Sequence, residues 1–275
     1  MKKLVVPVAA SLLASAAFAI DFEAPTYSGS SAGTVLTGQD GWYIPAVGGV
    51  DFNCYTYSGN ALGLGANPTG GDQFIGGTSA GATPARAQRD QDWSSAPVWK
   101  VSYDINSVYL GTLPTAQNLS SWSLQDGPTT KSFIALNTWV DIATATNWNM
   151  QYNVFDAGGL ALNNQSAGSA MENLEVNHWY RQSSTFSLVD NTVSEVSITD
   201  LETGITTTYN PTGWYLQGGA GSALPLPTAA RFFSGGALGN ATGFDNYTME
   251  AVPEPATIFA LGLGLAFLAS RKRRG

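Results

Sequence analysis

The feature that most constrains the fold is a series of strand-length segments over residues 20–250, separated by glycine, asparagine, aspartate and proline turns. The clearest segment alternates Trp99, Val101, Tyr103 and Ile105 with polar residues, which gives it one apolar and one polar face. No segment shows the periodicity of an amphipathic helix of three turns. Further strands are predicted at 132–141, 149–155, 185–189, 195–200, 205–209, 231–234 and 243–251. Strands at intervals of roughly ten residues predict an antiparallel β-sandwich or barrel.

One long hairpin is predicted around a turn at Glu202, Thr203 and Gly204, because glycine there supplies the positive φ of a tight turn. We expect Val196 and Ile198 to pair with Ile205 and Thr207, while Ser197, Thr199 and Thr206 face the other side. The segments 58–85 and 218–227 are rich in small residues and proline, and they are predicted to be loops. Long loops at the end of a sandwich are common places for ligands to bind.

The composition of residues 20–252 excludes several function classes. This part keeps 6 of the 12 basic residues and 19 of the 20 acidic residues, so its net charge is about −13. Such a surface repels phosphate backbones, which argues against a nucleic-acid partner. Cys54 is the only cysteine, so no intramolecular disulfide can form and stability must come from the core. A buried or incidental thiol is the preferred interpretation of Cys54, because the only histidine, His178, is far away in sequence.

The N-terminus has the pattern of a secretory signal peptide over residues 1–19. Lys2 and Lys3 precede an apolar stretch at 4–18, and Ala17-Phe18-Ala19 supplies the small-x-small cleavage site of a signal peptidase. The mature chain is therefore expected to begin at Ile20.

The C-terminus carries an apolar run, 256–269, of 14 residues followed by four basic residues. As a helix it would reach roughly 21 Å, which is short for a hydrocarbon core of about 30 Å. The basic cluster Arg271, Lys272, Arg273 and Arg274 favours a cytoplasmic end, so the body of the chain is expected outside. A tail anchor is the alternative, and length argues only weakly against it.

Residues 251–275 resemble the PEP-CTERM sorting signal of Gram-negative bacteria, because Pro253, Glu254 and Pro255 precede this short apolar helix and basic end. The resemblance implies recognition and processing by an exosortase, with transient residence in the inner membrane. It also implies a final place at the cell surface or in the extracellular matrix, in bacteria that make exopolysaccharide and biofilm.

Three stretches of residues 20–250 resemble the concanavalin A-like (laminin-G-type) jelly rolls: "DFEAPTYSGSSAGTVLTGQDGWYI", "NHWYRQSSTFSLVDNTVSEVSITDLETG" and "ARFFSGGALGNATGFDNYTMEAV". The resemblance implies one all-β, antiparallel jelly-roll sandwich, with the first and last strands side by side. That arrangement would bring Glu23 and Asp245 close together, where two carboxylates and backbone carbonyls could hold a structural Ca²⁺. Solvated charges on edge strands are the alternative.

Two function classes compete for this fold. A non-catalytic surface protein that binds polysaccharide needs exposed aromatic rings, and the candidates stand in polar, turn-rich sequence: Trp42, Trp93, Trp122, Trp148 and Trp214. For any single tryptophan, a place in the core is the favoured alternative.

The other class is a polysaccharide-cleaving hydrolase or lyase. No Glu-x-Asp-x-x-Glu pattern of the laminarinase type is present, and Glu172 and Glu175 would point to opposite faces of a strand. A lyase could use His178 with Trp179, Tyr180 and Arg181, but adjacent strand residues cannot all converge on one ligand. No catalytic residue is therefore assigned.

Mass spectrometry of the exported protein is expected to give an N-terminus at Ile20 and a chain without Arg271–Arg274. The physical reason is that both terminal apolar segments are expected to be targeting signals that are removed during export. Full-length chain in the cytosol would contradict this prediction.

Overall fold

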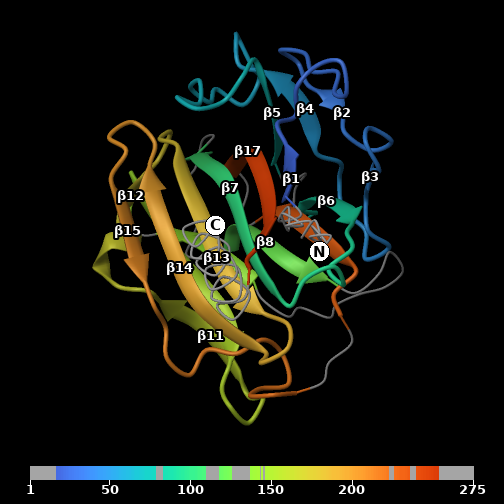
Figure 1. Cartoon of the computed structure of the whole chain (residues 1–275). Coiled ribbons are helices and arrows are strands. Elements are labelled where there is room, and N and C mark those ends of the chain that lie inside the picture. Colours follow the sequence, from blue (N-terminus) through green and yellow to red (C-terminus); the bar gives the residue numbers. More distant parts are fainter. Residues whose placement is uncertain are drawn as a thin grey trace, which may run out of the picture.

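The computed structural model describes residues 17–78, 83–109, 118–125, 137–142, 144, 146–222, 226–235 and 240–253. These residues form two antiparallel β-sheets stacked face to face (Figure 1), which confirms the predicted all-β jelly-roll sandwich. The helical structure in this part of the chain is a single 3₁₀ turn, η1 (Ser169–Met171).

The nine-stranded sheet has the following order: β15 (Thr206–Tyr209), β14 (Thr192–Asp200), β13 (Tyr180–Ser187), β7 (Val98–Tyr109), β17 (Asn240–Ala251), β5 (Gln73–Thr78), β4 (Asn53–Thr56) and β2 (Thr34–Val35), with β1 (Ala17–Ile20) also paired to β17. The eight-stranded sheet has the order β11 (Ala161–Ser166), β10 (Asn147–Phe155), β9 (Asn137–Ile142), β8 (Asn118–Gln125), β16 (Ala229–Ser234), β6 (Ala85–Asp90) and β3 (Trp42–Tyr43), with β12 (Leu174–Glu175) paired to β10.

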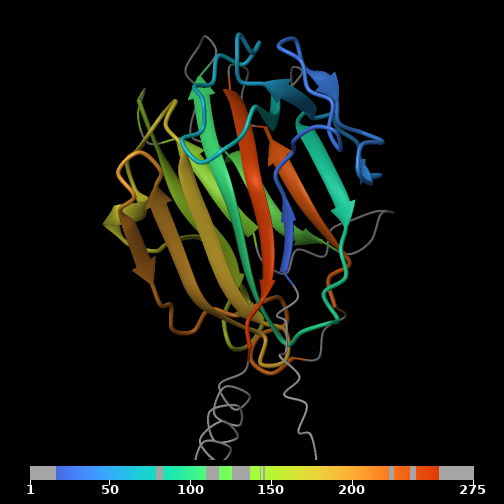
Figure 2. The same ribbon diagram turned by 45° about the horizontal axis from the view of Figure 1, so that its top comes forward.

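Strand β17 is central to the nine-stranded sheet, because it pairs with β7 on one side and with both β5 and β1 on the other. The pairing of β1 with β17 places Ala17 opposite Glu250 and Ile20 opposite Tyr247. This confirms that the first and last strands lie side by side, and both reach the same end of the sandwich (Figure 2). Ala17 and Ala19 of the predicted cleavage site lie in β1; cleavage there stays a prediction.

The predicted strand around Trp99–Ile105 is confirmed as part of β7. The prediction that 58–85 forms loops is confirmed for 58–72 but wrong for Gln73–Thr78, which forms β5 between β4 and β17; residues 79–82 lie outside the described residues. Glycine-rich sequence forms a strand here because side chains from neighbouring elements fill the space above it: a Cβ on Gly76 would lie 2.6 Å from Leu62 Cδ1. The two glycines of β5 therefore allow close packing over the sheet.

The β14–β15 hairpin forms as predicted, with Gly204 at φ 72°, but its register differs by two residues. Ile198 lies opposite Thr207 and Val196 opposite Tyr209. The turn is longer than expected because the Asp200 carboxylate accepts the backbone N–H groups of Glu202 and Thr203. The assignment of side chains to the two faces is unaffected.

Aromatic side chains fill the space between the two sheets. Phe232 on β16 is fully buried, and its ring centroid lies 4.4 Å from that of Phe244 and 5.4 Å from that of Tyr247. Cys54 is also buried there, and burial raises the pKa of its thiol to about 12, so the thiol stays protonated and unreactive at neutral pH. This agrees with the interpretation of Cys54 as a core residue.

Replacing Phe232 with alanine is expected to lower the free energy of unfolding by about 3–5 kcal/mol, because it removes a buried ring and leaves a cavity between the sheets. Phe233→Ala is the matched control: this neighbour is only partly buried and packs against Arg86. Urea unfolding of the two variants measures the difference, and equal losses would contradict the assigned core.

Candidate functional site

The outer face of the nine-stranded sheet, which points away from the other sheet, is divided into an apolar and a polar part. Residues 57–72, called here the cover segment, lie over the apolar part at one end of the sandwich (Figure 2). Beneath and within it lies a second buried cluster: Tyr55, Leu62, Leu64, Phe74, Val108, Trp179 and Ala241, with Tyr57 and Leu201 at its margin. The rest of the outer face is polar and is not covered by this segment.

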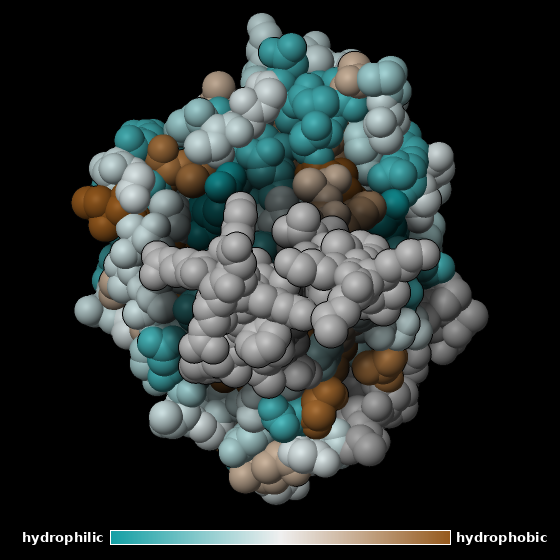
Figure 3. Space-filling view, viewed as in Figure 1, coloured by the Kyte–Doolittle hydropathy of each residue, from teal (hydrophilic) through white to brown (hydrophobic). Residues whose placement is uncertain are grey.

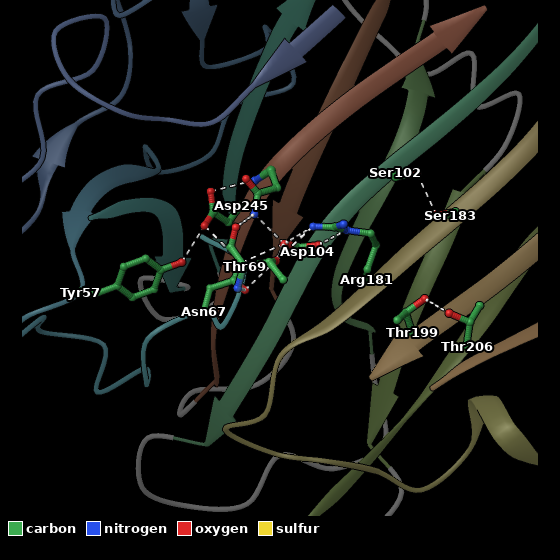
Figure 4. Close-up of polar contacts among 11 residues, drawn as sticks. Tyr57, Asn67, Thr69, Ser102, Asp104, Arg181, Ser183, Thr199, Thr206 and Asp245 are labelled. Atoms are coloured by element: carbon green, nitrogen blue, oxygen red, sulfur yellow. Dashed lines mark hydrogen bonds and ion pairs between the residues drawn. The ribbon is translucent and has the colours of Figure 1, made fainter. Parts of the chain in front are cut away.

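A pair of buried carboxylates marks the boundary between the two parts. Asp104 on β7 lies directly opposite Asp245 on β17, and both side chains are fully buried. Arg181 on β13 lies opposite Asp104 on its other side. Figure 4 shows the three side chains converging from adjacent strands, with Tyr57, Asn67 and Thr69 of the cover segment beside them.

The Asp104 carboxylate is held by an arginine in a bidentate ion pair. Arg181 donates from Nε to Oδ1 at 2.7 Å and from Nη2 to Oδ2 at 2.9 Å. Asn67 and Asn246 each donate a side-chain N–H to Oδ2 at 2.8 Å. A buried charge is tolerated when it is paired and hydrogen-bonded in this way.

The Asp245 carboxylate has only neutral donors. Oδ2 accepts the Tyr57 hydroxyl at 2.8 Å and Asn67 Nδ2 at 3.2 Å, and Oδ1 accepts the backbone N–H of Asn246 at 2.7 Å. Burial raises the pKa of the Asp245 carboxyl to about 7, and the neighbouring negative charge of Asp104 acts in the same direction.

Asn67 therefore fastens the cover segment to both carboxylates. Its Oδ1 atom in turn accepts the backbone N–H and the hydroxyl of Thr69. A second attachment joins Trp179 Nε1 to the carbonyl of Gly65 at 2.8 Å. An open depression of about 620 Å³ lies beside the segment, lined in part by Tyr57 and Asp72.

Beyond the carboxylate pair, five hydroxyl side chains stand in register across five adjacent strands of the outer face. Pairing of neighbouring strands places the members of this hydroxyl row in the order Thr208, Ser197, Ser183, Ser102 and Thr248. The Ser102 and Ser183 hydroxyls lie 2.7 Å apart. Figure 3 shows hydrophilic residues in a recess just below the loops at the top of the view.

Sequence reasoning had predicted only part of this site. The alternation in β7 indicated that Ser102 and Asp104 share a polar face, as they do. Asn67 and the register between β7 and β17 gave no signal, because these partners are far apart in the sequence.

The five tryptophans considered as sugar-binding residues lie in the core instead. The exposed fractions of Trp42, Trp93, Trp122, Trp148 and Trp214 are between 0% and 7%. In a sandwich without disulfides, large rings are the main source of buried apolar area. The prediction that these five tryptophans are exposed sugar-binding residues is therefore wrong.

The carboxylates of Glu23 and Asp245 both lie against the glycine pair Gly70–Gly71. A side chain added at Gly70 would collide with the Asp245 carboxylate, and one added at Gly71 would collide with the Glu23 carboxylate. The Glu23 carboxylate accepts the backbone N–H of Gln73 at 2.9 Å. Ca²⁺ needs about six to eight oxygen ligands, and the described residues contain no group of three or more His, Cys, Asp or Glu side chains suited to a metal. Two carboxylates alone do not complete such a ligand set, and a structural Ca²⁺ at Glu23 and Asp245 stays a prediction.

His178 lies at the end of the β14–β15 hairpin, with both ring nitrogens next to carboxylates. Nε2 is 3.0 Å from Asp200 Oδ1, and Nδ1 is 3.5 Å from Glu202 Oε1. Its ring packs on Tyr180, which belongs to the core, whereas Arg181 lies on the outer face. The residues of the lyase hypothesis do not converge on one ligand.

Of the predicted sorting signal, the structure describes Pro253, which is exposed just after β17; Glu254, Pro255 and the basic residues lie outside the described residues. Among the residues described, no helix is long and apolar enough to cross a membrane.

Comparison with known proteins supports the sorting signal directly. Residues 251–274 match the family described as the PEP-CTERM protein-sorting motif, so the chain carries this motif at its C-terminus. No curated protein matches the sequence.

Several solved structures are similar to this chain in fold. Lectin II from Ulex europaeus has a TM-score of 0.47 at 9% identity, covering 86% of this chain and 97% of its own. The metal-free exoplasmic/lumenal domain of VIP36 has 0.45 at 8% identity, covering 78% and 92%. The carbohydrate esterase vb_24B_21 from the Shiga toxin-encoding bacteriophage phi24B has 0.44 at 11% identity, covering 81% and 100%.

Asp245→Asn is expected to flatten the dependence of unfolding free energy on pH between about pH 4 and pH 7. Because the pKa of Asp245 is higher in the folded than in the unfolded chain, this group favours folding below about pH 4, and the contribution is lost as the pH rises through 7. One such proton changes the slope by at most about 1.4 kcal/mol per pH unit. Urea unfolding at several pH values measures the slope, and Asp21→Asn, on the surface, is the control. An unchanged slope for Asp245→Asn would contradict the burial assigned to this carboxyl.

Proposed function

We propose that this protein is exported through its PEP-CTERM motif, processed by an exosortase, and binds polysaccharide at the cell surface or in the extracellular matrix without cleaving it. The motif at 251–274 supports the export route. The outer face of the nine-stranded sheet is the proposed binding surface.

The observation that carries the proposal is the hydroxyl row. Each serine or threonine hydroxyl can donate one hydrogen bond and accept two, so pairs such as Ser102 and Ser183 retain capacity for the hydroxyls of a ligand. Among the described residues, the hydroxyls of Ser197 and Thr248 have no side-chain or backbone partner. Thr208 is exposed and Ser102 and Thr248 are partly exposed, whereas the other two serines of the row are nearly buried. A row of such groups suits a ligand that presents hydroxyls at regular intervals.

The boundary of this surface adds a charged and an aromatic group. Arg181 uses Nε and Nη2 on Asp104 and is about one third exposed, which leaves its outer edge for a sugar oxygen. Tyr57, at the edge of the cover segment, is partly exposed. Both groups lie on the same side of the row.

The alternative of a polysaccharide-cleaving enzyme has less support from the geometry. A glycosidase needs two carboxyl groups that flank the scissile bond. Asp104 and Asp245 are adjacent and buried, and their oxygens accept hydrogen bonds from Arg181, Asn67 and Tyr57. These carboxylates hold the fold together at this point rather than face a substrate.

A glycan array probed with the purified protein, with and without calcium, tests the proposal. We expect binding that is independent of calcium and no cleavage products. Thr208→Val, which removes one hydroxyl of the row, should weaken binding roughly threefold to tenfold, as expected for one lost hydrogen bond.

The matched control is Thr207→Val, the same change at the next residue of β15, whose side chain faces the other way and lines a separate depression with Ile198 and Ile205. It should leave binding unchanged. Absence of binding to every glycan would refute the proposed function, and release of sugars would favour the enzyme instead.

A further inference from the structure

The hydroxyl row lies between two rows of longer side chains. On one side the next row contains Thr206, Thr199, Arg181, Asp104 and Asp245. On the other side it contains Glu195, Thr185, Lys100 and Glu250. Serine and threonine are shorter than most of these side chains, and Ser183 and Ser197 are only 7% and 6% exposed. We therefore expect the row to form the floor of a shallow groove that runs across the strands rather than along them.

Resting on the proposed function, we infer that this groove takes an extended, equatorially linked and uncharged glycan chain, which lies perpendicular to the strands with about one sugar over each strand. Adjacent strands are about 4.8 Å apart, and an extended chain of equatorially linked hexopyranoses advances by nearly the same distance per residue. Each sugar would then meet one hydroxyl of the row. A glycan that coils into a helix cannot keep this spacing over five strands.

The charges beside the groove favour an uncharged ligand. Lys100 Nζ lies 3.6 Å from Glu195 Oε1, and Arg181 is paired with Asp104, so both cations beside the row already have a carboxylate partner. Glu250 on the same face is exposed and adds negative charge. A polyanionic chain would be repelled by these carboxylates and would find no unpaired cation beside the row.

The length of the row predicts how affinity depends on ligand length. Five strands contribute one hydroxyl each, so binding should strengthen with each added sugar up to about five and then level off. Isothermal titration with cello-oligosaccharides of two to six residues measures this dependence.

Two further hexasaccharides separate linkage from charge. Maltohexaose is uncharged but coils, and hexameric β-1,4-mannuronate is extended but anionic. We expect cellohexaose to bind at least tenfold more tightly than either of them. Equal binding of maltohexaose, or affinity that does not change between two and six sugars, would overturn the inference.

A variant that fills the groove tests its position. Ser197→Leu places a larger apolar side chain at the second position of the floor, and it should reduce cellohexaose binding at least tenfold. Ser194→Leu, at an exposed position of the same strand outside the row, is the control and should bind like the unmodified protein. Circular dichroism and urea unfolding establish that both variants fold. Equal binding by the folded Ser197→Leu variant would overturn the inference.

Failure of the inference and failure of the proposed function give different results. If maltohexaose or mannuronate binds best and Thr208→Val still weakens that binding, polysaccharide binding stands and the extended, uncharged ligand is wrong. If no glycan of the array or of the oligosaccharide series binds, both are wrong.

Discussion

The structure of the outer face depends on the buried carboxylate of Asp104. This charge lies at the centre of the nine-stranded sheet, beside the carboxyl of Asp245, and it would be very unfavourable without partners. Arg181 supplies the opposite charge, and Asn67 reaches down from the cover segment to both acids. Since the same asparagine serves both carboxylates, the position of residues 57–72 over the sheet follows from the need to satisfy them.

This attachment divides the outer face of the nine-stranded sheet into a covered apolar part and a hydroxyl-bearing part that the cover segment does not reach. Where the cover segment lies, the sheet is apolar and Trp179, Phe74 and Val108 are buried beneath it. Where the cover segment ends, the strands carry serine and threonine instead. A single antiparallel sheet can hold both because its outward residues change from apolar to hydroxyl-bearing along the strands. Its inward residues are mainly apolar, and the buried polar pair Gln182 and Ser184 on β13 is joined by a hydrogen bond.

The arrangement of the termini fits a protein presented at a surface. Strand β17 carries Asp245 at the site and continues through Ala251 to the sorting motif at 251–274. Its antiparallel partner β1 begins beside the end of β17, with Ala17 opposite Glu250, so both termini of the sandwich lie at the same end. The cover segment lies at the other end of the sheet (Figure 2), and the hydroxyl row lies between the cover segment and the end of the sheet at which β17 leaves the sandwich.

Much of the fold was readable from the sequence, because its signals are local. The alternation at Trp99–Ile105 predicted a half-buried strand, and Gly204 predicted the hairpin turn. The proline and basic residues at the C-terminus predicted the sorting motif. Only the tertiary structure decided that the tryptophans are buried, that Asn67 joins Asp104 to Asp245, and that five hydroxyls form one row. The physical reason is that alternation shows which residues of one strand share a face, but not which strands pair, in which register, or which face is covered.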